Sequence, residues 1–320
     1  MTINEIDTKD ISIVIQGAVD RENTARSIAS IRKNLPQAEI ILSTWEGTDV
    51  SCLNSDIVVF SKDPYGFQDK FCSTFTNNTL RQLISTQNGI HKATRRYILK
   101  IRSDLIIKSC NFLKYFNRFT ERDDRYKLFH HRLIFSSFFS KKFCSSDIAD
   151  QPLPFHVSDW LAFGFSEDIR LLYSVELPKE PETAWYLNIN KYRGVKADLL
   201  RGSHRYAPEQ YIFYNACKRV FPEIVFDNYL DYNRSNIQWS ENLIIQNCIL
   251  LDPWQFRFVC GKKKAGSDRY NKWTKYPFTM PKSLRRGMYS HKVFINDYEK
   301  YCMNKTNAKK GELDDLLLKR

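Results

Sequence analysis

The stretch YILKIRSDLII, residues 97–107, has the apolar pattern of a buried strand but carries three charged side chains near its end. Because side chains alternate along a strand, Lys100, Arg102 and Asp104 are predicted to point to the same side of the sheet. A carboxylate at a strand end can hold a divalent cation, and lysine and arginine can bind the oxygens of a diphosphate. The stretch therefore predicts a site for a phosphorylated ligand, and a structural Arg102–Asp104 ion pair is the alternative.

The elements that position these residues can be recognised in the first hundred positions, where strand and helix signals alternate. Four apolar runs predict strands, at residues 11–17, 38–44, 56–61 and 97–104. Helical periodicity predicts helices between residue 23 and Pro36 and over residues 67–90, with Gly89 as the C-cap of the second. This order predicts an α/β fold with a Rossmann-type open, mostly parallel sheet flanked by helices, followed by a less regular C-terminal part.

In an open parallel sheet, ligands bind outside the carboxyl ends of the strands. This rule gathers the polar residues at four strand ends around one crevice, namely Gln16, Gly17, Thr44, Trp45, Asp63, Arg102, Ser103 and Asp104. Gln16 could hydrogen-bond a nucleobase or ribose, Gly17 would let the backbone approach a ligand, and Trp45 could stack on a ring. A plain turn at residues 16–17 and a core position for Trp45 are the alternatives.

Two polar residues of the predicted helix over residues 67–90 join these candidates. Asn78 and Arg81 are three positions apart and share a face of this helix. Arg81 could bind a phosphate or a sugar, because a guanidinium group forms paired hydrogen bonds with oxygen ligands. A solvated helix face is the alternative.

Several blocks of the sequence, taken together and in order, are similar to a known family. They are ISIVIQGAV, SIRKNLPQAEIILSTWEG, NNTLRQLISTQNGI, LKIRSDLII, SDWLAFG and PEQYIF within residues 10–215, and more weakly FVCGKKKAG beyond. The chain thereby resembles the WavE family of lipopolysaccharide-synthesis proteins and, more broadly, glycosyltransferases of the GT-A fold. The resemblance implies transfer of a sugar from a nucleotide-sugar donor to a lipopolysaccharide or capsule-type surface glycan.

The resemblance also implies roles for two segments in the middle of the chain. In HVSDWLAFG, Asp159 would hold sugar hydroxyls, Trp160 would stack on a ring of the acceptor, and Gly164 would permit its close approach. In PEQ, at the start of a helix predicted over residues 208–221, Glu209 would be the catalytic base. Asp159 is a second candidate for the base, and an ordinary first-turn acid is the alternative for Glu209.

Metal binding is a further implication of the resemblance. GT-A enzymes often carry Asp-x-Asp where this chain has Arg102-Ser103-Asp104, so Asp104 could hold Mg²⁺ or Mn²⁺ while Arg102 takes over part of the role of the cation. A late histidine, His291, is the candidate for a second metal ligand. His204 and Arg205 could bind an anionic acceptor or the leaving diphosphate. A structural role is the alternative for each histidine.

Charge is unevenly distributed along the 320 residues, which carry a formal net charge of +13. Residues 251–320 contain 17 Lys and Arg against 7 Asp and Glu, whereas the other 250 residues contain 32 against 29. The resemblance implies a GT-A-like domain, and the change in charge places its end near residue 250. We expect this domain over residues 1–250, with a nucleotide-binding half at about 1–110 and an acceptor half at about 111–250. The basic extension over residues 251–320 is expected to pack on this domain and to attract an anionic partner.

The sequence predicts neither a membrane span nor a secretion signal. Its first ten residues, MTINEIDTKD, are polar and acidic, and no apolar run approaches the roughly 18 residues of a transmembrane helix. The eight cysteines show no CxxC or other metal-binding spacing. We expect a cytoplasmic protein that is peripheral on the inner face of the cytoplasmic membrane through its basic extension, where lipid-linked acceptors are displayed.

Two other functions are compatible with the same residues. A sugar-phosphate transferase would use the same carboxylate and arginine groups but would cut the donor at phosphorus. A nucleic-acid-binding protein would use the basic extension, in which Trp254, Phe256, Tyr270, Trp273 and Tyr276 are interleaved with cations. Because the α/β part is nearly charge-balanced and carries no nucleic-acid-binding motif, no nucleic-acid partner is expected.

Overall fold

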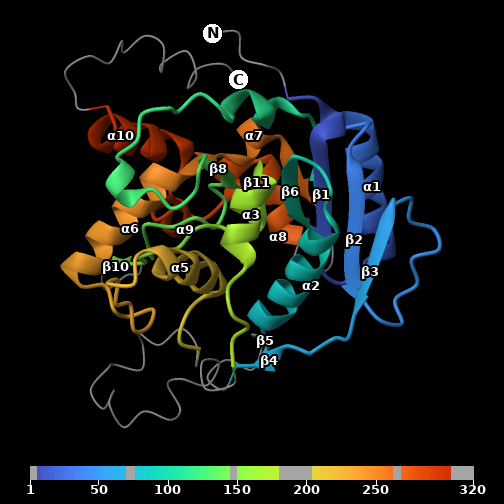
Figure 1. The fold of residues 1–320 in the computed structure, drawn as a ribbon, viewed down its shortest axis with the longest axis horizontal. Helices are drawn as coiled ribbons and strands as arrows, with labels where there is room; N and C mark the ends of the chain where they lie inside the picture. Colours follow the sequence, from blue (N-terminus) through green and yellow to red (C-terminus); the bar gives the residue numbers. More distant parts are fainter. Residues whose placement is uncertain (1–5, 70–75, 145–149, 180–203, 262–267, 304–320) are drawn as a thin grey trace.

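The computed structural model describes residues 6–69, 76–144, 150–179, 204–261 and 268–303 (Figure 1). Within these residues a sheet of seven strands forms the centre, in the order β12-β8-β11-β6-β1-β2-β3. Its strands are β1 (Ile11–Gln16), β2 (Glu39–Trp45), β3 (Ile57–Ser61), β6 (Tyr97–Arg102), β8 (Leu133–Ser136), β11 (Leu161–Phe165) and β12 (Cys248–Leu251). Only β11 runs antiparallel to its neighbours. The predicted α/β class with a mostly parallel sheet is confirmed, and it is consistent with a GT-A-like fold.

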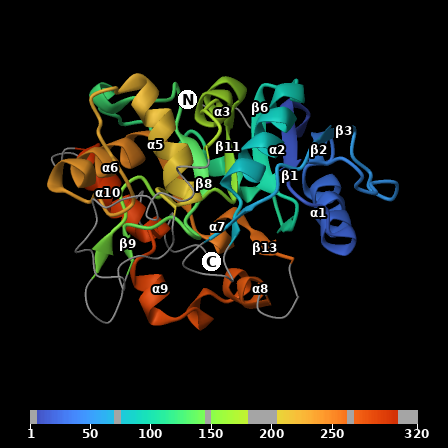
Figure 2. The same ribbon diagram turned by 90° about the horizontal axis from the view of Figure 1, so that it is seen from below.

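Helices cover both faces of this sheet. The longer ones are α1 (Arg21–Asn34), α2 (Thr79–Lys92), α3 (Ser166–Tyr173), α5 (Pro208–Val220), α6 (Arg234–Asn247), α8 (Asp268–Lys275) and α10 (His291–Tyr301). The shorter ones are α7 (Pro253–Phe256), α9 (Lys282–Arg286), η1 (Thr8–Asp10), η2 (Asn111–Tyr115), η3 (Asp124–Tyr126) and η7 (Pro277–Thr279). Figure 2 shows α2, α3 and α5 on one face of the sheet and α1 and α8 on the other.

The start of α2 differs from the helix predicted over residues 67–90. The helix begins only at Thr79, where the backbone N–H donates to the Asn77 side chain at 3.0 Å. Before it, β4 (Phe67–Gln68) and β5 (Thr76–Asn77) form a small antiparallel pair. The prediction was wrong here because the short polar side chain of Asn77 accepts a hydrogen bond from nearby backbone. Such a bond favours the end of the strand at Asn77 and the start of the helix at Thr79. The first helix, α1, likewise begins two residues early, behind its N-cap Asp20.

Gly89 is a contact residue inside α2 and not the predicted C-cap, since the helix continues to Lys92. A Cβ atom at Gly89 would lie 2.5 Å from Cγ1 of Val14 and 3.0 Å from Cβ of Ser43. The absence of a side chain therefore lets α2 pack closely on β1 and β2. This contact holds the helix that carries Arg81 and Gln82 against the sheet.

We expect Gly89→Ala to lower the free energy of unfolding by about 1–3 kcal/mol, the usual cost of overpacking a core. At an exposed helix position the same change would stabilise the protein by about 1 kcal/mol. A loss of stability in Gly89→Ala would therefore show that α2 packs closely on the sheet at this position. Urea unfolding of the variant and of His91→Ala, an exposed position on the same helix, measures it. A more stable Gly89→Ala protein would contradict the close packing.

Residues after 250 contribute to the same packed body. β13 (Phe258–Cys260) pairs antiparallel with β7 (Leu105–Ile107), the strand that directly follows Asp104. Phe256, Tyr289 and Phe294 belong to the buried cluster that also contains the strands of the sheet. Two short strands, β9 (Phe143–Cys144) and β10 (Gln151–Pro152), complete the elements. The basic residues at 262–264 and those after 303 lie outside the described residues.

Candidate active site

The guanidinium group of Arg102, at the carboxyl end of β6, is held on two sides. Its Nε and Nη2 atoms donate to the two Asp104 oxygens at 3.0 and 2.6 Å, and its Cζ lies 4.2 Å from the centroid of a Trp160 ring. The third nitrogen, Nη1, has no hydrogen-bond partner in the described part of the chain, and 24% of the side chain is exposed. The ion pair suggested as an alternative is present, and it leaves one edge of the guanidinium group for a ligand.

The ends of β1 and β6 are tied together beside Arg102. The Ser103 N–H donates to the Gln16 carbonyl at 3.0 Å, and the Ser103 hydroxyl donates to the Ala18 carbonyl at 2.6 Å. Gly17 has φ +111°, a conformation that favours glycine, and a Cβ atom there would meet nothing closer than 3.8 Å. The Gln16 side chain is buried and accepts a hydrogen bond from Ser85. The turn at Gly17 therefore offers backbone to a ligand, whereas Gln16 serves packing.

The antiparallel direction of β11 brings its first residues to the same edge of the sheet. Leu161 pairs with Ile101, and the N–H of Arg102 donates to the Trp160 carbonyl at 3.3 Å. Asp159 therefore lies directly beside the end of β6. No other strand of the central sheet, within the described residues, contributes its amino end to this edge.

Lys100 lies near Asp159, Arg102 and Asp104 but is covered by other residues. Its side chain is fully buried and its amine donates to the backbone carbonyl of Asp159, which also accepts from Gln82 at 3.3 Å. The amine lies 5.5 Å from the Tyr173 ring centroid, and burial lowers the Lys100 pKa to about 8. A direct contact with a diphosphate is therefore not what this structure provides. Because β6 is a central strand, its charged residue is covered, and Lys100 holds the backbone of Asp159. Its role in donor binding stays a prediction.

Glu209 and Asp159, the two candidates for the catalytic base, lie close enough for the charge of one to act on the other. Burial and then the negative charge of Asp159 raise the Glu209 pKa from 4.5 to about 8, although the helix start and Lys141 act in the opposite direction. His156 Nε2 lies 3.9 Å from a Glu209 oxygen. Burial, followed by the charge of Lys141, lowers the His156 pKa to about 3, so this imidazole is neutral at physiological pH.

The candidates on β2 and α2 form a second, more packed cluster. Thr44 is fully buried and Trp45 is 6% exposed, which is the core position given as the alternative for Trp45. The Arg81 guanidinium lies 5.2 Å from the Trp45 ring centroid and forms two hydrogen bonds with Asp63, at 2.9 and 2.7 Å. Asn78 is exposed and accepts from Arg81 at 3.3 Å. The structure therefore joins these predicted residues to each other, with Asn78 the most accessible.

Gly164 lies away from the end of β11 that borders Arg102. It pairs with Ile98, three residues from the Leu161–Ile101 pair and so about 10 Å along the strand. A Cβ atom on Gly164 would lie 2.1 Å from Cδ2 of Leu133. Its lack of a side chain therefore serves packing between strands, and the structure does not bring it to the predicted acceptor position.

His291 is likewise enclosed in the core. Its Nδ1 lies 2.6 Å from the Leu250 carbonyl oxygen, and aromatic rings of Tyr115 and Phe119 meet it edge-on. Burial lowers its pKa, so the imidazole is kept neutral. The prediction of a metal ligand is not supported by this position, because a neutral histidine surrounded by rings is a core residue.

The residues at the candidate site fit Mg²⁺ or Mn²⁺ poorly. Both oxygens of Asp104 accept hydrogen bonds from Arg102, and Cys260 and Gly261 close over the same residue. Among the described residues no group of three His, Cys, Asp or Glu side chains is placed to hold a metal ion. The guanidinium group of Arg102 occupies the two Asp104 oxygens that a metal ion would use.

His204 and Arg205 lie in the segment that leads into α5. His204 Nδ1 lies 3.6 Å from an Asp69 oxygen, and its ring packs beside Tyr229. Arg205 Nη2 lies 3.1 Å from an oxygen of Asp227. Both predicted acceptor residues therefore border the helix that begins with Glu209, in contact with acidic side chains. Their role stays a prediction.

Comparison with known proteins connects this geometry to a family. The model of a family described as WavE lipopolysaccharide synthesis matches residues 11–312. The chain belongs to the WavE family. The match includes every candidate residue from Gln16 to His291. No curated protein matches the chain.

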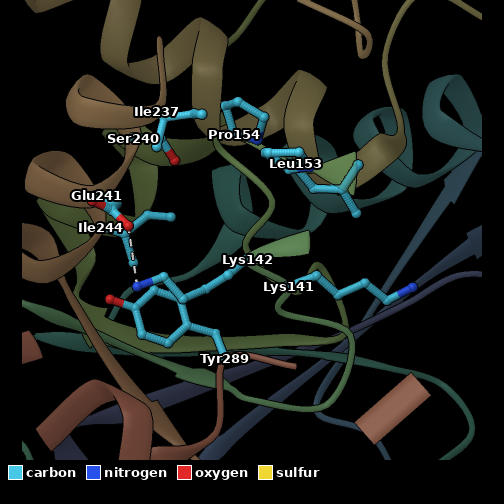
Figure 3. A pocket seen from close by; sticks show the side chains of 10 residues that line it. Lys141, Lys142, Leu153, Pro154, Ile237, Ser240, Glu241, Ile244 and Tyr289 are labelled. Atoms are coloured by element: carbon cyan, nitrogen blue, oxygen red, sulfur yellow. Dashed lines mark ion pairs between the residues drawn. The ribbon is translucent and has the colours of Figure 1, made fainter. Parts of the chain in front are cut away.

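A separate hollow of this WavE protein lies between α6, residues 141–142 and residues 152–154 (Figure 3). Lys142 extends into it and binds Glu241 at 3.2 Å, above the ring of Tyr289. Lys141 extends the opposite way in Figure 3, and its charge acts on Glu209 and His156. The hollow is therefore distinct from the strand-end site. Of two adjacent lysines, Lys142 extends into the hollow and Lys141 extends away from it.

Sequence reasoning missed His156, Lys141 and Gln82 as neighbours of the WavE site. His156 stands within the conspicuous block HVSDW, but nothing in its spacing relates it to Glu209, 53 residues later. Gln82 follows Arg81 on α2 and could be noticed only as a polar helix residue. These three side chains converge through the fold, so no local pattern could have identified them.

Proposed function

We propose that this protein is a glycosyltransferase that moves a sugar from a nucleotide-sugar donor to a lipopolysaccharide or capsule-type surface glycan. The observation that carries the proposal is Arg102, whose guanidinium is fixed by Asp104 and Trp160 and keeps one edge free beside Asp159. Membership of the WavE family supports the lipopolysaccharide context. The arrangement suits a reaction in which negative charge develops on a diphosphate leaving group.

The proposed role of Arg102 is to bind the leaving diphosphate. Its free Nη1 would donate to a phosphate oxygen while Asp104 holds the group in a fixed orientation. The backbone turn at Gly17 and the neighbouring Ser103 would approach the same ligand from the end of β1. A preorganised cation of this kind stabilises developing charge without rearrangement during the reaction.

Glu209 is proposed to take the proton of the acceptor. The acceptor hydroxyl oxygen forms a bond to the anomeric carbon, the bond from that carbon to the diphosphate oxygen breaks, and the hydroxyl proton passes to the Glu209 carboxylate. A raised pKa makes this carboxylate a stronger base near neutral pH. Asp159, held by Lys100 and Gln82 through its backbone, would orient the acceptor hydroxyls.

The proposed mechanism gives the charge of a divalent cation to Arg102. Mg²⁺ or Mn²⁺ would compete with Arg102 for the two Asp104 oxygens, both of which are already bonded. We therefore propose that donor binding needs little or no added metal. The basic region after residue 250 is proposed to bring the enzyme to a membrane that displays its acceptor.

A thermal-shift screen of UDP-, GDP-, CMP- and dTDP-sugars, with and without Mn²⁺, tests donor binding. One nucleotide class is expected to raise the melting temperature by a few degrees at about 100 times its Kd, because a ligand that binds only the folded state stabilises it by about 2.7 kcal/mol. The shift should persist without Mn²⁺. No shift with any nucleotide sugar would contradict the proposal.

The released nucleotide separates this function from sugar-phosphate transfer. With the donor class identified by the screen, phosphorus NMR of the products should show a nucleoside diphosphate for UDP, GDP or dTDP donors. Release of the monophosphate from such a donor would identify cleavage at phosphorus and overturn glycosyl transfer. A CMP-sugar donor releases the monophosphate in either case, so there the acceptor product must be analysed for phosphate.

A further inference from the structure

The segment from α8 to α9, residues 268–286, carries two exposed aromatic side chains at its turn. The Tyr276 side chain is 53% exposed and that of Phe278 is 72% exposed, and their ring centroids are 6.0 Å apart. Pro277 lies between them and starts the 3₁₀ turn η7. Two neighbouring exposed rings form a contiguous apolar patch, and such patches mark interaction surfaces more often than single exposed rings do.

Basic residues flank these rings along the sequence, and Asp268, at the start of the segment, is its only acidic residue. Residues 269–292 contain seven Lys and Arg and no Asp or Glu. Six of the cations lie on the exposed surface of the segment, namely Arg269, Lys272, Lys275, Lys282, Arg285 and Arg286. Only Arg286, which binds Asp150 at 2.7 Å, forms an ion pair within the described residues. We call these six cations together with Tyr276 and Phe278 the α8–α9 surface.

The α8–α9 surface lies at the periphery of the molecule. Figure 2 shows α8 and α9 on the same side, outside the layers formed by the sheet and its helices. The exposed aromatic rings lie in the turn between α8 and α9, and exposed cations lie on both of these helices. Aromatic and basic side chains in this arrangement are typical of contacts with the interface of a bilayer.

The inner side of the same segment packs on the candidate active site. Tyr270 lies 5.7 Å from Trp160, ring centroid to centroid, and Arg102 lies over Trp160. Trp273, Met280 and Leu284 line a small apolar hollow with Phe138 and Phe139, and Phe139 stacks on Trp160 at 5.4 Å. The outer surface is therefore connected to the site through a continuous layer of aromatic contacts.

We propose that the α8–α9 surface binds an anionic lipid bilayer, with Tyr276 and Phe278 entering the headgroup region. Among the described residues no helix is long and apolar enough to cross a membrane, so the contact would be peripheral. Positive charge attracts the surface to anionic lipid, and the rings add apolar burial. Bound in this way, the protein would hold Trp160 and Arg102 close to lipid-linked glycans. Only this last consequence rests on the proposed transferase function.

Flotation of the full-length protein with vesicles tests the proposal. Binding is expected with phosphatidylcholine vesicles that contain phosphatidylglycerol, and much less with phosphatidylcholine alone. Tyr276→Ser combined with Phe278→Ser should weaken binding at least fivefold, and this loss should persist at high salt. Replacing four cations by glutamine should weaken binding at least tenfold at low salt, at positions Lys272, Lys275, Lys282 and Arg285.

Matched controls change equally exposed side chains elsewhere. Val225→Ser is the aromatic-pair control, since Val225 is 71% exposed. The charge control replaces four exposed lysines by glutamine, at positions Lys33, Lys92, Lys114 and Lys218. Both controls should bind vesicles like the wild type, and melting curves should show that all variants are folded.

Three results would overturn the proposal: equal binding of the test and control variants, binding that does not depend on anionic lipid, and binding of a single-stranded oligonucleotide instead of vesicles. The last would mark this surface as a nucleic-acid contact. Because flotation requires neither a donor nor sugar transfer, it can fail while the nucleotide-sugar screen succeeds, or the reverse. The two proposals are therefore tested separately.

Discussion

The double variant Arg102→Gln/Asp104→Asn is expected to lose about 10²–10³-fold in kcat for sugar transfer while it remains folded. The loss follows because the guanidinium is the cation proposed to stabilise the leaving diphosphate. Both charges are removed together because Arg102→Gln alone would take the arginine away from the nearly buried Asp104, whose side chain is 5% exposed, and breaking a buried ion pair costs about 3–5 kcal/mol. The measurement is kcat and KM with the donor found by the nucleotide screen, together with a melting curve.

The chain offers a control with the same geometry at another place. Arg125 binds Asp123 through the same two nitrogens and at the same spacing of two residues, but its side chain is 81% exposed. Arg125→Gln/Asp123→Asn should leave kcat unchanged. If Arg102→Gln/Asp104→Asn also transferred sugar at the wild-type rate, the Arg102–Asp104 pair would be only structural. In that case the proposed role in leaving-group stabilisation would be wrong.

The rate of transfer is expected to rise with pH and to level off above about pH 8, the pKa of Glu209. The base acts in its ionised form, which is only about one tenth of the population one unit below that pKa. Glu209→Gln should remove this ascending limb and lower kcat by about 10²–10⁴-fold. A pH–rate profile of the wild type and the variant measures both effects.

Asp159→Asn provides the matched test of the pair. The negative charge of Asp159 helps to raise the Glu209 pKa, so its removal should shift the midpoint of the pH profile toward lower pH. An unchanged midpoint would show that the observed ionisation belongs to another group. A profile that falls through pH 8 would show that Glu209 acts in its protonated form, and the assignment as base would then be wrong.

The same ionisation has a consequence for stability that needs no substrate. The folded protein keeps a proton on Glu209 up to about pH 8, whereas the unfolded chain loses it near pH 4.5. Stability is therefore expected to fall as pH rises through this window, because the folded state binds more protons. Glu209→Gln should be the more stable protein at about pH 9, by on the order of a few kcal/mol.

Local patterns in the first hundred residues were sufficient to predict the strands that build the site. Buried parallel strands have nearly continuous apolar sequences, so β1, β2, β3 and β6 were predicted within one or two residues of their observed ends. Because parallel strands end at one edge, Gly17, Arg102 and Asp104 could be expected to meet there. The resemblance of several blocks to the WavE family was confirmed over residues 11–312.

Only the tertiary structure decided which side chains are buried and which residues far apart in the sequence lie close together. The sequence suggests that Lys100 binds a ligand. In the structure its position on a central strand leaves its side chain fully buried, and its amine donates to the Asp159 carbonyl. The sequence suggests that a ligand can approach the backbone at Gly164. In the structure the space beside Gly164 is filled by the side chain of Leu133 from the neighbouring strand β8. A one-dimensional pattern gives the direction of a side chain from its own strand, and it does not specify what covers that side chain.

The chemistry of Glu209 likewise depends on the fold. Its place in the first turn of a helix suggests a lowered pKa, because the helix start favours an anion. In the folded chain the opposite shift prevails, since burial and the charge of Asp159, 50 positions earlier, outweigh the helix start. Sequence alone therefore determined the residue types and the strand ends that carry them. The structure determined which of them are covered, paired or charged, because desolvation and Coulomb interactions depend on distances in space.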